Sequence, residues 1–87
     1  MTPSHPLHWR QRVRRSTVLP IWDYTPISGR QTTYATIYSS GTGYVLQTCD
    51  APGAGYPWTD HGTHETLAVA QAAGKAEVEA RMAGAGR

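Results

Sequence analysis

Apolar and polar residues alternate most clearly in the middle of the chain. Residues 32–39 combine threonine, tyrosine and isoleucine, which favour β-strands, and residues 44–49 form a second apolar-rich run. The Ser-Gly-Thr-Gly sequence between them, residues 40–43, is typical of a tight loop. The pattern therefore predicts a β-hairpin at the centre of the domain.

The length of this loop also predicts which residues of the hairpin pair. A four-residue loop places Ser39 opposite Tyr44, and therefore Ile37 opposite Leu46 and Ala35 opposite Thr48. We predict that the core face holds Ala35, Ile37, Tyr44 and Leu46. A slip of one residue would carry Gln47 onto that face, and burying its amide without a partner costs about 1–3 kcal/mol.

Two further elements flank the hairpin. Residues 18–24 are rich in β-branched and aromatic side chains, and Pro20 among them predicts an edge strand or a bulged one. Residues 63–83 predict a helix that Thr63 caps and Gly84 ends, with Leu67 in the core. Residues 50–63 are rich in glycine and proline and are expected to form a long loop.

These elements predict an α+β fold, a three- or four-stranded antiparallel sheet packed against one C-terminal helix. We expect residues 17–87 to form a single small domain, preceded by a basic arm over residues 1–16 that is ordered late or not at all. Within the arm, a short helical turn and an extra strand are both open. A chain of 87 residues supports one thin core, which favours a binding module over an enzyme.

The charge of the chain is unevenly distributed. The net charge is +2, but residues 1–30 carry five arginines against Asp23 alone, and residues 31–87 carry an acidic excess. Four of these arginines lie close together, at Arg10, Arg12, Arg14 and Arg15, beside one tryptophan. Such a segment is either a nucleic-acid contact or a solvated basic tail.

The aromatic residues suggest a second kind of surface. There are five tyrosines and three tryptophans but no phenylalanine, a composition that suits half-exposed contact positions. If Leu19 and Ile21 point into the core, strand alternation predicts an exposed platform of Trp22, Tyr24, Tyr34 and Tyr38. Such a platform is typical of a protein-binding hot spot or a base-stacking surface.

Catalytic and metal chemistry find little support. His61 and His64 have no accompanying ligand motif, and Cys49 has no nucleophile motif around it, so we expect no metal, no cofactor and no enzymatic activity. A lone cysteine excludes an intrachain disulfide and favours a cytoplasmic setting. No apolar run approaches the roughly 20 residues that span a bilayer, so we expect no membrane association.

The order of three strands and an Ala-rich helix over residues 17–83, with a Thr/Glu helix start, resembles small accessory proteins of phages and mobile elements of high-GC bacteria. That resemblance implies an inhibitor or adaptor that recognises a host protein, and the aromatic platform is the surface that we expect it to use. In element order the chain also resembles DNA-binding modules of the AP2 and integrase arm-binding type. The alternative function is therefore nucleic-acid binding by the arginine arm and the aromatic face. A homodimer through the Ala-rich helix is a further expectation.

Overall fold

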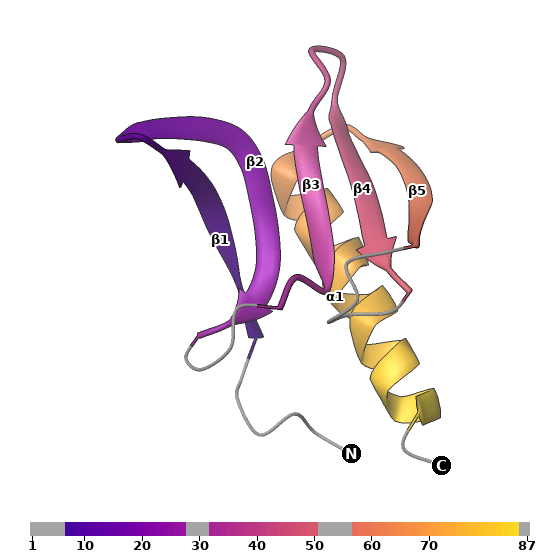
Figure 1. Cartoon of the computed structure of the whole chain (residues 1–87). Coiled ribbons are helices and arrows are strands. Elements are labelled where there is room, and N and C mark those ends of the chain that lie inside the picture. Colours follow the sequence, from indigo (N-terminus) through magenta and orange to yellow (C-terminus); the bar gives the residue numbers. More distant parts are fainter. Residues whose placement is uncertain (1–6, 28–31, 51–56, 86–87) are drawn as a thin grey trace.

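In the part of the chain that the structure describes, five strands and one helix form the fold, and each strand pairs with the next one along the chain. The computed structural model describes residues 7–27, 32–50 and 57–85. The sheet is antiparallel throughout and its strand order is the chain order (Figure 1). The strands are β1 Leu7–Arg14, β2 Thr17–Pro26, β3 Ala35–Ser39, β4 Tyr44–Cys49 and β5 Trp58–His64, and helix α1 spans Leu67–Ala85. The α+β fold with one C-terminal helix is confirmed, with five strands in place of three or four.

The central hairpin has the predicted register. Ile37 lies opposite Leu46, and Ser39 lies opposite Tyr44. Within the loop, the Ser40 amide donates a hydrogen bond of 2.9 Å to the Gly43 carbonyl, and Gly41 adopts a φ of 87° that favours glycine. Ile37 and Leu46 are fully buried, so this hairpin supplies the centre of the core.

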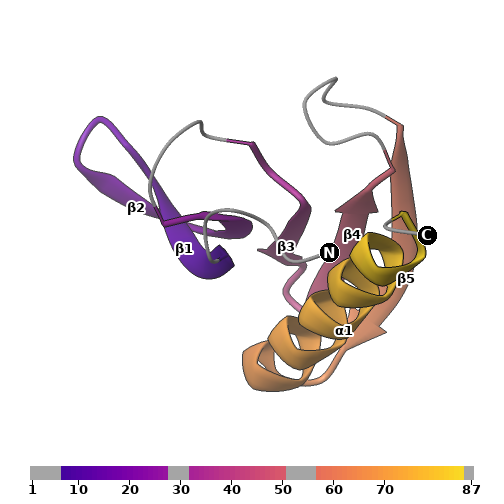
Figure 2. The same ribbon diagram turned by 90° about the horizontal axis from the view of Figure 1, so that it is seen from below.

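Helix α1 covers one face of the sheet, over β3, β4 and β5 (Figure 2). Its buried positions are small: Ala70 and Gly74 lie one turn apart, followed by Val78. A β-carbon at Gly74 would lie 2.9 Å from Leu46 Cδ1, so glycine permits close approach of the helix to the sheet. The predicted core residue Leu67 packs half-buried at the helix start.

The helix begins later than the sequence suggests. Its cap is Thr66, whose hydroxyl accepts a hydrogen bond of 3.2 Å from the Val69 amide, and not Thr63. Thr63 lies in β5 opposite Val45. Strand β5 occupies much of the expected long loop, and it is interrupted by a bulge at His61 and Gly62 that conceals its alternation. Gly62 has a φ of 82°, which explains the glycine.

The N-terminal segment is a strand, which corrects the expected late-ordering arm. Residues 7–14 form β1 at the edge of the sheet, so of the two open conformations the extra strand is the observed one; residues 1–6 lie outside the described residues. Strand β2 pairs with both β1 and β3 and is therefore not an edge strand. The expected bulge is present around Pro20, because one residue of β1 faces three of β2 between Gln11↔Trp22 and Val13↔Val18.

Among the described residues, α1 is the single helix. It is not long and apolar enough to cross a membrane.

Candidate nucleic-acid interface

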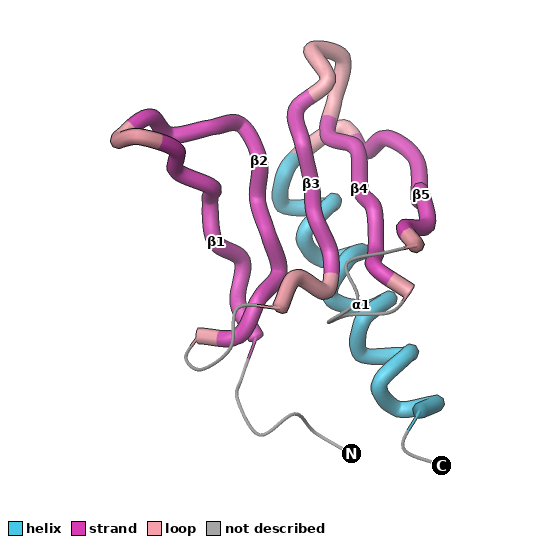
Figure 3. Tube along the Cα trace, in the orientation of Figure 1, coloured by secondary structure: helices cyan, strands magenta, loops and turns pink. Residues whose placement is uncertain are grey.

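Strands β1 and β2 form a two-stranded ribbon that extends beyond the rest of the sheet. We call residues 7–26 the basic hairpin. Strand β3 pairs with β2 only from Ile21 to Tyr24, so the β2 residues Thr17–Pro20 have no neighbour other than β1. Both ribbon views place the turn end of this hairpin away from α1 (Figures 1 and 2). The tube view shows its short turn between two long strands (Figure 3). The end of the hairpin therefore has no further strand beside it, and its residues 10–18 are exposed.

Three arginines of β1 occupy alternate positions, and alternate residues of a strand share one face. Arg10 lies opposite Asp23 and Arg14 opposite Thr17, while Arg12 contacts Asp23 directly. The shared face is the one opposite the helix, since the preceding residue Trp9, which points to the other face of β1, packs against the core. Among the described residues, Arg10 and Arg14 have no ion-pair partner. Their guanidinium groups are available to an anionic ligand.

The fourth arginine lies in the turn itself. Arg15 and Ser16 have φ angles of 51° and 67°, which is the sign that a type I′ hairpin turn requires at both central residues. Asparagine and glycine are the residues that adopt this conformation readily, and other residues lose roughly 1–2 kcal/mol in it. Both residues are exposed. The turn thus presents a cation at some expense in local stability.

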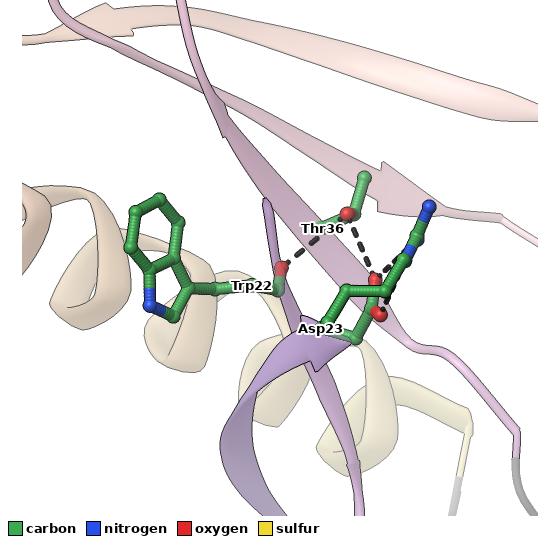
Figure 4. Close-up of polar contacts among 4 residues, drawn as sticks. Trp22, Asp23 and Thr36 are labelled. Carbon is green, nitrogen blue, oxygen red and sulfur yellow. Dashed lines mark hydrogen bonds and ion pairs between the residues drawn. The ribbon is translucent and has the colours of Figure 1, made fainter. Parts of the chain in front are cut away.

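A polar network fixes the base of the hairpin to the sheet. The Arg12 guanidinium donates two hydrogen bonds to the Asp23 carboxylate, Nε to Oδ2 at 3.0 Å and Nη2 to Oδ1 at 2.8 Å. The Thr36 hydroxyl lies 3.0 Å from the same carboxylate and 3.3 Å from the Trp22 carbonyl (Figure 4). The hydrogen bond with Asp23 raises the pKa of Arg12. The network joins β1, β2 and β3, so it sets the direction in which the free ribbon points.

A pocket of about 190 Å³ lies beside this network. It brings together two guanidinium groups, one carboxylate and two threonine hydroxyls, and it is lined by Arg10, Gln11, Arg12, Val13, Asp23, Thr25 and Thr33. Guanidinium and hydroxyl groups are the donors that bind phosphate oxygens. Since Asp23 already holds Arg12, the cation that remains for a ligand is Arg10.

The expected aromatic platform is wrong as a shared surface. Trp22 pairs with Ile37, and Tyr24 pairs with Ala35, so both lie on the helix-covered face. The Trp22 indole and the Asp23 carboxylate point to opposite sides of β2 (Figure 4). The ring of Tyr24, only 5% exposed, lies 4.7 Å from that of Trp9.

The other two residues of the expected platform also lie apart. Tyr34 packs half-buried against the core, and Tyr38 is 38% exposed on the open face. The cause of the error is the alternation of β2, because Trp22 and Tyr24 take the inward positions that were assigned to Leu19 and Ile21.

Cationic and acidic side chains lie in different parts of the molecule. The basic hairpin carries four arginines against one aspartate, whereas the rest of the described chain carries two cations against five acidic residues. Three of those acidic residues, Glu65, Glu77 and Glu79, lie in or just before α1. A field of this form directs a polyanion to the hairpin and away from the helix.

The two histidines that the sequence singled out, His61 and His64, both lie in β5. His61 Nε2 lies 2.7 Å from the Thr48 hydroxyl, but Thr48 is fully buried and Cys49 is 2% exposed. His64 Nε2 is buried without a hydrogen-bond partner in the described structure. Among the described residues no three His, Cys, Asp or Glu side chains are grouped so as to hold a metal ion.

Asp50 joins the sheet to the end of the helix. It accepts a hydrogen bond of 2.7 Å from Thr59 and forms an ion pair with Arg81 of α1. The Thr59 hydrogen bond and the Arg81 cation lower the pKa of Asp50. On the outer side of α1, Val69 is 53% exposed among alanines; a homodimer through this side stays a prediction.

Comparison with known proteins adds no relative: no family model, curated protein or solved structure matches the chain. Sequence reasoning identified the arginines but not the ribbon that carries them. The signal was present in the β-branched residues Val13, Thr17 and Val18 on either side of Arg15-Ser16, but the turn lacks the usual Asn-Gly.

Proposed function

We propose that the chain is a non-catalytic nucleic-acid-binding module that contacts the phosphate backbone through the basic hairpin. The observation that carries this proposal is the row of Arg10, Arg12 and Arg14 on one face of a ribbon whose turn adds Arg15. Arginine is the residue best suited to phosphate, since its planar guanidinium donates paired hydrogen bonds.

Protection of the sheet edge is the plainest other explanation of these arginines. Charged side chains on an edge strand prevent pairing with another chain. That explanation applies to β1, including Arg10 and Arg14. It does not apply to Arg15, which lies in the turn and holds a backbone conformation that asparagine or glycine would hold at lower energy. Energetically unfavourable backbone conformations that persist in a fold often mark functional positions.

Recognition of a host protein through the aromatic face has less support. It depends on four aromatic side chains sharing a surface, and two of them belong to the helix-covered face. Tyr38 alone gives a small contact area. We therefore rest the proposal on the hairpin.

Salt dependence of binding tests the proposal. Each phosphate contact releases counterions, so replacing Arg10, Arg14 and Arg15 with Ala should weaken binding to labelled oligonucleotides and reduce the salt slope by about 2–3. Arg12 is left in place because its removal would leave Asp23 without its cation. For single substitutions, Lys75→Ala is the matched control, since it removes one exposed cation from α1. If Arg14→Ala and Lys75→Ala have the same small effect, or if the wild-type protein binds no nucleic acid, the proposal is wrong.

A further inference from the structure

The shape of the basic hairpin restricts which nucleic acid it fits. We infer that its free end enters the major groove of B-form duplex DNA. This inference rests on the proposed function and goes beyond it, because phosphate contacts alone would not distinguish duplex DNA from RNA or from a single strand.

The length of the free ribbon matches the depth of this groove. Four residues of β2, Thr17–Pro20, extend past the last pairing with β3 at Ile21. Because three β2 residues face a single β1 residue at the bulge, β1 sets the length of the free ribbon. Its residues Arg12–Arg14, at about 3.3 Å each, project roughly 10 Å before the width of the turn is added. The major groove of B-DNA is about 8.5 Å deep. The ribbon is therefore long enough to reach the base edges while the body of the domain stays outside.

The width of the two-stranded ribbon also matches this groove. Two paired strands lie about 4.8 Å apart, and the B-form major groove, about 12 Å wide, accepts such a ribbon with its side chains. The minor groove is only about 6 Å wide, and the major groove of A-form RNA is too narrow to be read. B-form DNA is thus the duplex that has room for this element.

The side chains at the end of the ribbon suit contacts with both the base edges and the phosphates of that groove. Val13 and Val18 are direct cross-strand partners, and each is 58% exposed. On the opposite face Arg14 pairs with Thr17. Arginine donates to the O6 and N7 atoms of guanine and to phosphate, and aliphatic groups contact the methyl group of thymine. A solvated tail has no need of an exposed valine pair, whereas a groove gives both faces a partner.

Competition and duplex type test the inference. The wild-type chain is titrated into a DNA duplex of two helical turns, an RNA duplex of the same sequence, and the single DNA strand. We expect the DNA duplex to bind at least about tenfold more tightly than either of the others, a difference of about 1.4 kcal/mol, because only the B-form duplex offers a major groove that admits the ribbon. Methyl green, which occupies the major groove, should displace the protein, and the minor-groove ligand distamycin should not.

A steric block provides a second measurement. Val18→Cys, labelled with a bulky neutral maleimide, should bind DNA at least about tenfold more weakly, because each tenfold corresponds to about 1.4 kcal/mol of lost contact. Val69→Cys carries the same label at a similarly exposed position of α1 and should bind as the wild type does. Cys49 is buried and should not react.

Different results would contradict the major-groove inference and the proposed function. Equal binding to the RNA duplex or the single strand, displacement by distamycin alone, or full binding by the labelled Val18→Cys would overturn the major-groove inference. The hairpin would remain the nucleic-acid contact if the arginine variants still lost affinity. Absence of binding to all three probes would overturn the proposed function itself.

Discussion

The indole of Trp9 lies against the backbone of α1 at Gly74, so that a side chain of the first strand contacts the helix directly. A β-carbon at Gly74 would lie 2.9 Å from both the Cη2 and Cζ2 atoms of Trp9. This contact, together with the hydrogen bonds of Asp23, holds the base of the basic hairpin.

Gly74→Ala tests how closely the two elements pack. Alanine stabilises a helix by about 1 kcal/mol relative to glycine, but overpacking costs about 1–3 kcal/mol. We expect a net loss of about 1 kcal/mol, measured by urea unfolding, with a change in tryptophan fluorescence. Ala76→Gly, at an exposed position of α1, reports the propensity difference alone. A Gly74→Ala protein more stable than the wild type would show that the contact is not tight.

The hairpin turn should separate stability from binding. Ser16→Gly relieves a positive φ and should stabilise the hairpin by about 1 kcal/mol without loss of affinity for DNA. Arg15→Asn should also stabilise the turn but weaken binding, because it removes a cation. Hydrogen exchange of the hairpin amides and a DNA titration measure the two effects. If Arg15→Asn keeps full affinity, Arg15 does not contact the nucleic acid.

Replacing Asp23 should weaken the fold and strengthen DNA binding. Asp23→Asn removes the ion pair with Arg12 and weakens the bond with Thr36, so we expect a loss of about 1 kcal/mol in stability. The same change frees Arg12 and raises the charge of the hairpin by one, which should tighten DNA binding at low salt. Chemical denaturation and binding isotherms report each part. Asp60→Asn, on the opposite edge strand, is the charge-matched control and should not tighten binding comparably.

Acid should weaken the attachment of the helix to the sheet. Because the folded state lowers the pKa of Asp50, its ionised form stabilises the fold fully above the unfolded pKa of about 3.9. That contribution is lost as the pH falls through the lower folded pKa. Asp50→Asn should therefore be less stable than the wild type near neutrality and approach it in acid. A constant difference across a series of thermal melts would contradict this.

At high pH, ionisation of Tyr24 should lower the stability of the fold. Burial, and secondarily the charge of Glu79, raise the pKa of Tyr24. The neutral phenol is therefore favoured by the fold, and its contribution is complete below the unfolded pKa of about 10 and is lost as the pH rises through the higher folded pKa. Tyr24→Phe should reduce the loss of stability in alkali. Equal alkaline midpoints for the two proteins would show that Tyr24 does not titrate with unfolding.

The central hairpin could be derived from the sequence because a short loop fixes its register. Once Ser39 faces Tyr44, alternation places Ile37 and Leu46 together in the core. Strand β5 could not be derived in this way, because the bulge at Gly62 breaks the alternation and its residues are largely polar.

The faces of β2 were assigned wrongly for a related reason. Its pairing with β3 is not set by a tight turn, so nothing local decides whether Trp22 or Ile21 points inward. For the candidate site, the sequence identified the arginines. Their common face and the positive φ of Arg15 depend on pairing with β2, which a row of arginines does not indicate.

The succession of strands also has a consequence for how the chain folds. Every strand pair joins neighbours in the sequence, so the sheet can be assembled from short closures that cost little chain entropy. The contact between Trp9 and Gly74 is different, because it joins opposite ends of the described chain. We therefore expect α1 to dock onto Trp9 after the sheet has formed, so that the ribbon forms before the helix packs against it.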